Sequence, residues 1–294
     1  MTRTQDFGSR PAPISKRRGI SRALGLGLIA GAADDDPSAI GTYASAGAKL
    51  GPAFLWTAPV TLPMMFAVVY LSAKLGQVSG RGLFQVIKEY YPRWLLYPTL
   101  IGVLLGNTIE AGADLGGMAA AVNMFVPVPV SLIVVAIAGL ILALQFYGSY
   151  ILVRNVFRWL ALVLLAYVGA AVLARPDLGE VLRGTFIPTI QFNGDFLTII
   201  VAVIGTTLSA YLYSWQSNQE VEEKIAAGQS RLSERKGATE AELESSGRDV
   251  LIGMLFSNVV MYFIILSTAA TLHKAGQTDI QSATDAAQAL RPLA

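Results

Sequence analysis

The chain of 294 residues contains no cysteine and a single histidine, His273. Without cysteine it can form neither a disulfide bond nor a thiolate metal site. Charged residues are also scarce at 14% of the chain, whereas a soluble domain usually carries about 25%. Together with the hydrophobic fraction of 53%, this scarcity indicates a membrane protein rather than an ordinary soluble domain.

Long apolar segments are the main feature of the sequence. Seven segments approach the length of about 20 residues that a helix needs to cross a bilayer. If the N-terminus is cytoplasmic, most of the 22 lysine and arginine residues lie on the cytoplasmic side, as the positive-inside rule requires. We therefore predict an all-α, multi-pass protein of the bacterial inner membrane, with lipid and no nucleic acid among its partners. The predicted spans are 19–46, 53–76, 94–124, 127–149, 155–174, 195–217 and 249–272.

The polar segments complete the predicted organisation. Residues 1–18 are basic and lack a signal-peptide cleavage pattern, so we interpret them as a disordered cytoplasmic leader. Residues 218–248 are highly charged, and we expect a solvated, partly helical cytoplasmic loop there. Residues 273–294 are predicted to be a polar extracytoplasmic tail. Spans one to five lie within 19–175, and spans six and seven lie within 195–272.

Three consecutive carboxylates, Asp34, Asp35 and Asp36, interrupt the first span and are followed directly by Pro37. An ionised group in mid-membrane costs at least ~2.5 kcal/mol and usually marks an ion or substrate pathway. The proline removes a backbone donor and frees carbonyl groups from the helix. We predict a cation site at this helix break, with Asp36 as the ligand, because no mid-membrane lysine or arginine is available to pair with it.

The third span carries two further acids, Glu110 and Asp114, which are four residues apart and share one helix face. That face must look into protein or water rather than lipid. For Asp34 and Asp35, a structural role, a supporting charge and a proton-carrying role all stay open. We group these four residues as supporting acids or a proton pathway.

The sixth span combines hydroxyl oxygens at Thr206, Ser209 and Tyr211 with the helix-weakening Gly205. Such oxygens are ligands of hard divalent cations. Hydrogen bonding between helices is an equally good interpretation of the hydroxyl groups. We predict a second helix break at Gly205 and include the three hydroxyl residues in the metal site.

Two interrupted helices five spans apart are typical of transporters whose site lies between internal repeats. A carrier of an organic solute, coupled to a cation or proton on the same fold, is the alternative, although it would need fewer acids around its site. A retinal-type receptor would need a lysine in the last span, where none occurs. The sequence contains neither a nucleophile–base pair nor a phosphate-binding loop that would indicate an enzyme.

Four stretches resemble the NRAMP family of divalent metal transporters. The first, GLGLIAGAADDDPSAIGTY, resembles the first helix of the family and is closer to a divergent bacterial branch than to the usual Asp-Pro-Gly-Asn signature. The others, GADLGGMAAA, GTTLSAYLYSWQSNQEVEE and DVLIGMLFSNVVMYFIILSTAATLH, resemble its third, sixth and seventh helices.

The resemblance implies a LeuT-type fold of the APC superfamily, in which two inverted repeats of five helices surround a central site. It also implies proton-linked uptake of manganese, iron or magnesium, with the metal as substrate and no cofactor. This chain would supply the first repeat and two helices of the second. We therefore expect a sequence truncated after the seventh helix, with a non-transporting fragment as an alternative.

Position by position, the resemblance is mixed. Asp36 and Pro37 match the metal-binding aspartate and the proline of the family, whereas Ala39 replaces a metal-binding asparagine. Thr206 aligns with the residue that lends a backbone carbonyl to the metal, and Asp114 with an acid of the proton pathway.

Three further replacements bear on the choice of ion. Ser209 stands where the family has methionine, Tyr211 where it has histidine, and Gly117 where it has glutamate. A thioether favours softer metals and a hydroxyl does not, so we hypothesise a shift towards a harder or more hydrated ion such as magnesium or manganese. Proton coupling would then rely on the other acids of the site.

Overall fold

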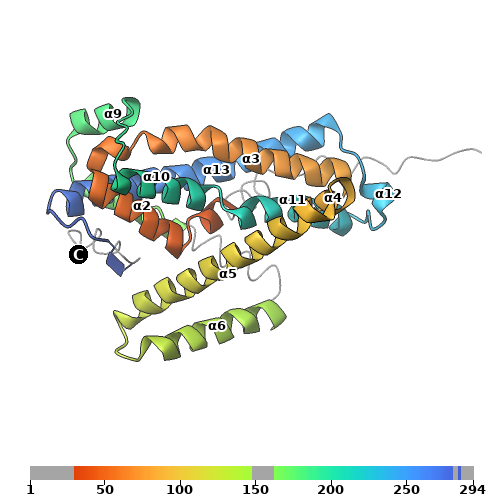
Figure 1. The fold of residues 1–294 in the computed structure, drawn as a ribbon, viewed down its shortest axis with the longest axis horizontal. Coiled ribbons are helices and arrows are strands. Elements are labelled where there is room, and N and C mark those ends of the chain that lie inside the picture. The colour runs from red at the N-terminus through yellow and green to blue at the C-terminus, as the bar shows by residue number, and fades with distance from the viewer. Residues whose placement is uncertain (1–29, 148–161, 281–283, 286–294) are drawn as a thin grey trace, which may run out of the picture.

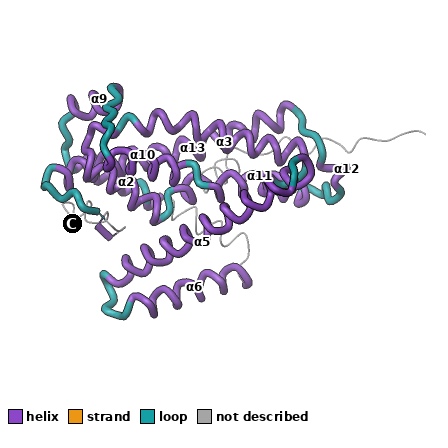
Figure 2. The backbone as a smooth tube through the Cα atoms, viewed as in Figure 1, coloured by secondary structure: helices purple, strands orange, loops and turns teal. Residues whose placement is uncertain are grey.

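The computed structural model describes residues 30–147, 162–280 and 284–285. Within these residues the chain is helical and contains no strand, which confirms the all-α prediction (Figure 2). Most helices run along the long axis of the molecule, and α5 and α6 form a hairpin that diverges from the main bundle (Figure 1).

Several helices follow the predicted spans closely. They are α3 (Thr57–Ser79), α5 (Arg93–Asn123), α6 (Val130–Tyr147) and α13 (Glu240–Thr268), which continues as the π-helix η2 (Ala269–His273). The sixth span is divided into α10 (Gly194–Thr207) and α11 (Ala210–Ala226). In the described part of the chain, α3, α6, the α10–α11 pair and α13 with η2 are long and apolar enough to cross a membrane.

The predicted spans 19–46 and 155–174 extend outside the described residues. Their described parts contain α2 (Pro37–Leu50) and α8 (Ala166–Leu173). Four short helices lie between or after spans: η1 (Gly51–Phe54), α4 (Leu83–Tyr90), α9 (Leu178–Phe186) and α12 (Leu232–Arg235). Helix extends into the charged stretch 218–248 from both sides, because α11 reaches Ala226 and a capping box at Thr239 starts α13.

Glycines let the bundle helices approach one another at backbone distance. A Cβ atom at Gly47 of α2 would collide with the Ile265 carbonyl and the Thr268 hydroxyl of α13. A Cβ atom at Gly76 of α3 would collide with the Ser217 carbonyl of α11. These contacts hold α2, α3, α11 and α13 together as the core that positions the site.

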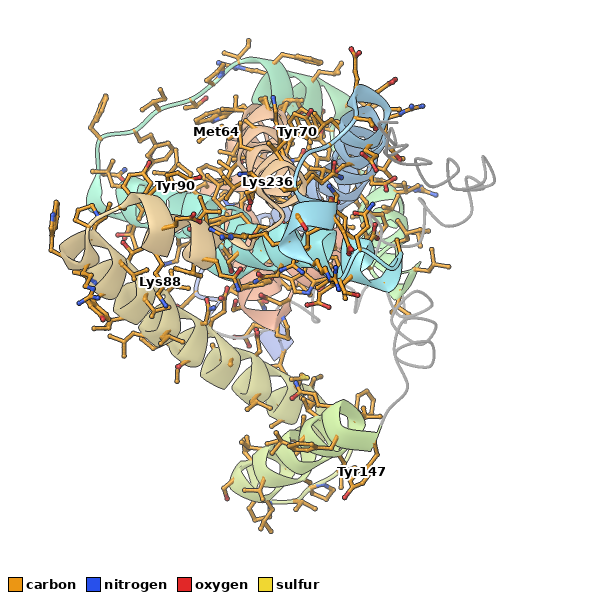
Figure 3. All side chains as sticks on the ribbon, turned by 90° about the vertical axis from the view of Figure 1, so that its right-hand side faces the viewer. Met64, Tyr70, Lys88, Tyr90, Tyr147 and Lys236 are labelled. Carbon is orange, nitrogen blue, oxygen red and sulfur yellow. The ribbon has the colours of Figure 1, made fainter. Side chains whose placement is uncertain are left out.

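The α5–α6 hairpin instead exposes its apolar side chains. Ile109 of α5 is 74% exposed, and Val135 of α6 is 70% exposed. Tyr147 lies at the far end of α6, away from the bundle (Figure 3). Surfaces of this kind are too apolar for water and match the lipid contact of a membrane helix.

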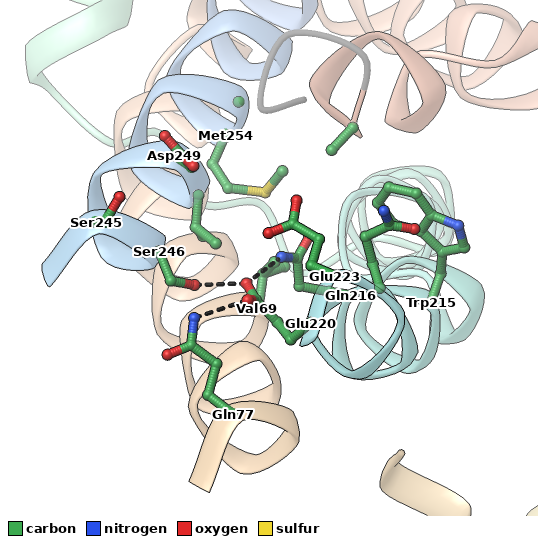
Figure 4. Close-up of a pocket in the computed structure, with 14 residues that line it drawn as sticks. Val69, Gln77, Trp215, Gln216, Glu220, Glu223, Ser245, Ser246, Asp249 and Met254 are labelled. Atoms are coloured by element: carbon green, nitrogen blue, oxygen red, sulfur yellow. Dashed lines mark hydrogen bonds between the residues drawn. The ribbon is translucent and has the colours of Figure 1, made fainter. Parts of the chain in front are cut away.

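A buried carboxylate joins three bundle helices on the side of the α11–α13 connection. The oxygens of Glu220 on α11 accept hydrogen bonds from Gln77 of α3 (2.7 Å), Ser246 of α13 (2.6 Å) and Gln216 one turn earlier (3.1 Å) (Figure 4). Three donors around one carboxylate leave its oxygens well satisfied.

Replacing Glu220 with glutamine should destabilise the bundle by about 2 kcal/mol. The NH₂ group of the new amide would face a side chain that now donates a hydrogen bond to the carboxylate, and the network is buried. Glu222→Gln on the exposed face of the same helix is the matched control and should change stability by less than about 0.5 kcal/mol. Thermal unfolding in one detergent compares the two variants. Equal midpoints would show that the network does not stabilise the bundle.

Candidate functional site

The first helix break falls within the acid triplet. Residues 30–34 are helical, Asp35 and Asp36 are not, and Pro37 is the first residue of α2. The Oδ1 atom of Asp36 caps α2 by accepting hydrogen bonds from the Ala39 amide (2.8 Å) and the Ser38 hydroxyl (2.7 Å). Aspartate before a helix and proline in its first turn are both favoured by local chemistry.

The second break falls at Leu208 and Ser209, between α10 and α11. The prediction of a break at Gly205 is therefore wrong in position. Gly205 lies inside α10, whose last turn is closed by a hydrogen bond from the Leu208 amide to the Ile204 carbonyl (3.0 Å). A single glycine costs a helix only about 1 kcal/mol, so the hydrogen-bonded turn tolerates it.

Tyr211 brings the two breaks together. Its hydroxyl donates to the Ala33 carbonyl (2.6 Å) and lies 3.3 Å from the Oδ2 atom of Asp36. A second pair, the Tyr43 hydroxyl and the Thr207 hydroxyl at 3.3 Å, joins α2 to the end of α10. Tyr211 is therefore in the site, and its hydroxyl is engaged in holding the first break.

The acids of α5 approach the same place from the other side. The Oδ1 atom of Asp114 accepts a hydrogen bond from the Ser38 amide (3.1 Å) at the start of α2. Glu110 lies one turn away on the same helix and is partly exposed. The structure therefore brings Asp114 to the first break, with Glu110 beside it on the α5 face.

Asp34 and Asp35 form their side-chain hydrogen bonds with α13. The Ser257 hydroxyl lies 2.7 Å from Oδ2 of Asp34 and 3.3 Å from Oδ1 of Asp35. The other oxygens, Oδ1 of Asp34 and Oδ2 of Asp35, are buried and have no hydrogen-bond partner. Sequence reasoning missed Ser257, although a polar Ser-Asn pair in the middle of the seventh span was a readable signal.

The remaining predicted ligands differ in what they offer. The Thr206 hydroxyl donates to the carbonyls of Ala202 (3.0 Å) and Val203 (3.1 Å) in its own helix, which occupies its proton. The Ser209 hydroxyl is buried at the second break and has no hydrogen-bond partner. A buried polar group without a partner is costly and calls for a bound ion or water.

Both helix breaks present oxygen atoms, from side chains and from the ends of helices. Two helix C-termini, those of residues 30–34 and of α10, end at the breaks, where carbonyl groups lack intrahelical partners and carry partial negative charge. Among the described residues, no three histidine or acidic side chains converge as a complete metal cage. The described residues therefore present separate carboxylate, hydroxyl and carbonyl oxygens at the breaks rather than a complete cage of side chains.

Comparison with known proteins identifies the family of this chain. The family model described as "Natural resistance-associated macrophage protein-like" (Nramp) matches residues 27–294. Proteins named "Divalent metal cation transporter MntH" are similar to the chain. The Bacillus subtilis protein is 30% identical, with 88% of this chain and 60% of the relative covered. The Deinococcus radiodurans protein is 29% identical, with 94% of this chain and 63% of the relative covered. The Klebsiella pneumoniae (strain 342) protein is 28% identical, with 99% of this chain and 68% of the relative covered.

The chain thus spans about 60 to 68% of the length of these curated relatives. The match of the family model extends from just before the acid triplet to the last residue, so it includes both helix breaks and α13. The chain belongs to the Nramp family, whose LeuT-type fold accords with the two facing breaks.

Proposed function

We propose that this chain belongs to a transporter of divalent metal cations, with Asp36 as the charged ligand. The observation that carries the proposal is the pairing of two helix breaks, one holding the Asp36 carboxylate and the other the unpartnered, buried Ser209 hydroxyl. The names of the relatives, which describe divalent metal cation transport, support it.

The number of available protein oxygens favours a hydrated, hard ion as the substrate. Mg²⁺ dehydrates reluctantly and is usually bound through one or two carboxylates and several waters. Among the described residues at the breaks, the site offers Asp36, the Ser209 hydroxyl and carbonyls at the helix ends, and the predicted ligands include neither methionine nor histidine. Magnesium or manganese therefore fits this site better than a soft metal such as cadmium.

A cavity near the first break extends the proposal. It has a volume of about 40 Å³, and its lining includes Glu220, Gln77 and Met254 (Figure 4) as well as Ala30 of the helix that precedes the break. This volume is enough for water, which needs ~10–15 Å³ on the same measure. We extend the proposal to uptake across the inner membrane with the N-terminus cytoplasmic, coupled to protons through Glu110 and Asp114.

The direct test is uptake of Mn²⁺ and Mg²⁺ by proteoliposomes that contain the 294-residue chain. Uptake above that of empty vesicles is expected. If the vesicles take up neither ion and calorimetry detects no binding of either, the proposal is refuted. Uptake of an organic solute without metal would favour the alternative carrier function.

Selectivity gives a sharper test at Ser209. Replacing Ser209 with methionine should raise the affinity for Cd²⁺ relative to Mg²⁺ by about tenfold or more, because a thioether is a softer ligand than a hydroxyl. Ser214→Met is the matched control, since the Ser214 hydroxyl already bonds to the Tyr211 carbonyl within α11 (3.1 Å). Competition for Mn²⁺ uptake measures both ratios, and an unchanged ratio in the Ser209 variant would exclude Ser209 from the coordination shell.

A further inference from the structure

The structure divides the acid triplet into two groups that face different helices. Asp36 is half-buried and lies by Tyr211 of α11. Asp34 is 0% exposed and Asp35 is 3% exposed, and both face Ser257 of α13, which is itself 0% exposed. Asp34 and Asp35 thus share a hydrogen-bond partner on α13 that Asp36 does not contact.

No positive charge among the described residues balances these two carboxylates. In the part of the chain that the structure describes, no lysine or arginine side chain forms an ion pair or hydrogen bond with either carboxylate. Ser257 has one hydroxyl proton and can donate it to only one of them. Burying two ionised carboxylates with so little compensation is very costly, so something must neutralise them.

Protonation alone does not satisfy the geometry. Oδ1 of Asp34 and Oδ2 of Asp35 are buried and have no hydrogen-bond partner. A proton on Oδ1 of Asp35 could be donated to the Ser257 hydroxyl, but these two buried oxygens would still have no partner, which is unfavourable. A bound cation would occupy lone pairs on these oxygens and neutralise the charge in one step.

We propose that Asp34, Asp35 and Ser257 form a second divalent cation site, occupied together with the site at Asp36. Two carboxylates match the charge of one divalent cation, and the Ser257 hydroxyl supplies a further oxygen from α13. The choice of ion rests on the proposed function, but the site itself rests on the buried pair. Two cations in neighbouring sites repel each other, and this repulsion speeds release from a site that binds tightly, as in multi-ion pores.

The experiment measures stoichiometry on the full chain in lipid nanodiscs, with Mn²⁺ as the probe detected by electron paramagnetic resonance and competed with Mg²⁺. The wild-type chain should bind two Mn²⁺ ions. The Asp34→Asn/Asp35→Asn double variant, which keeps side-chain shape, should bind one. Ser257→Ala should still bind two, with the affinity of the second ion lowered about tenfold.

Two controls separate this proposal from the proposed function. Asp36→Ala should also bind one Mn²⁺, now at Asp34 and Asp35, whereas Asp195→Asn removes an exposed acid of α10 and should bind two. A wild-type stoichiometry of one, or two ions in a folded Asp34→Asn/Asp35→Asn variant, overturns the second site and leaves the Asp36 site standing. Loss of all binding in Asp36→Ala would also overturn it, because the second site would then not exist independently.

Discussion

Asp36→Ala is expected to abolish Mn²⁺ and Mg²⁺ uptake by proteoliposomes. The variant removes the charged side chain that faces Tyr211 between the two breaks, and no group of three histidine or acidic side chains among the described residues could replace it as a metal site. It also removes the cap of α2, so a loss of stability of about 1 kcal/mol accompanies the loss of transport.

Asp36→Asn separates these two effects. Asparagine caps helices as well as aspartate does, so α2 should keep its stability while the site loses its charge. Asp177→Ala is the matched control for a lost cap, because Asp177 caps α9 through the amides of Gly179 (2.7 Å) and Glu180 (3.0 Å). We expect Asp36→Asn to be stable and inactive and Asp177→Ala to be less stable and active. Wild-type uptake by Asp36→Asn would contradict the assignment of Asp36 as the charged ligand.

Gly47→Leu should prevent the chain from folding into its native bundle. Even a Cβ atom at this position would collide with backbone and side-chain atoms of α13, and a leucine cannot be accommodated without separating α2 from α13. The expected cost is more than about 3 kcal/mol, the upper range for overpacking a core, because backbone atoms cannot yield as a flexible side chain does.

Gly139→Leu on α6 is the matched control, because nothing lies within 4 Å of a Cβ atom added there. Size-exclusion profiles and thermal midpoints in one detergent should show a native profile for Gly139→Leu and aggregated or absent protein for Gly47→Leu. A native midpoint for Gly47→Leu would show that α2 and α13 do not pack as closely as described.

Local chemistry made some features of the site predictable. The break at Asp36 and Pro37 follows from a cap residue and a proline, which act within one helical turn. The start of α13 likewise follows from a local signal, the capping box at Thr239 and Glu242, and it lies in residues 218–248, which the sequence predicts to be partly helical. The proposed metal-binding role of Asp36 stays a prediction that the uptake experiments test.

Other features depend on contacts between distant segments and could not be predicted. Gly205 makes a helix easier to break but does not force a break. The interruption falls three residues later, just before Tyr211, which contacts Asp36. The division of the triplet depends on Ser257, more than 200 residues away. Periodicity along the first span gave no indication of which acid would face which helix.

Under the proposed function, Asp36 would both bind the cation and cap α2, so ion binding would directly affect this helix. One oxygen of this carboxylate already receives the Ala39 amide and the Ser38 hydroxyl, while the other lies by Tyr211. An ion that draws electron density from these oxygens weakens their hydrogen bonds to the first turn of α2. Under the proposed function, tight ion binding and a well-formed first turn of α2 therefore oppose each other, and a stable α2 would favour release of the ion.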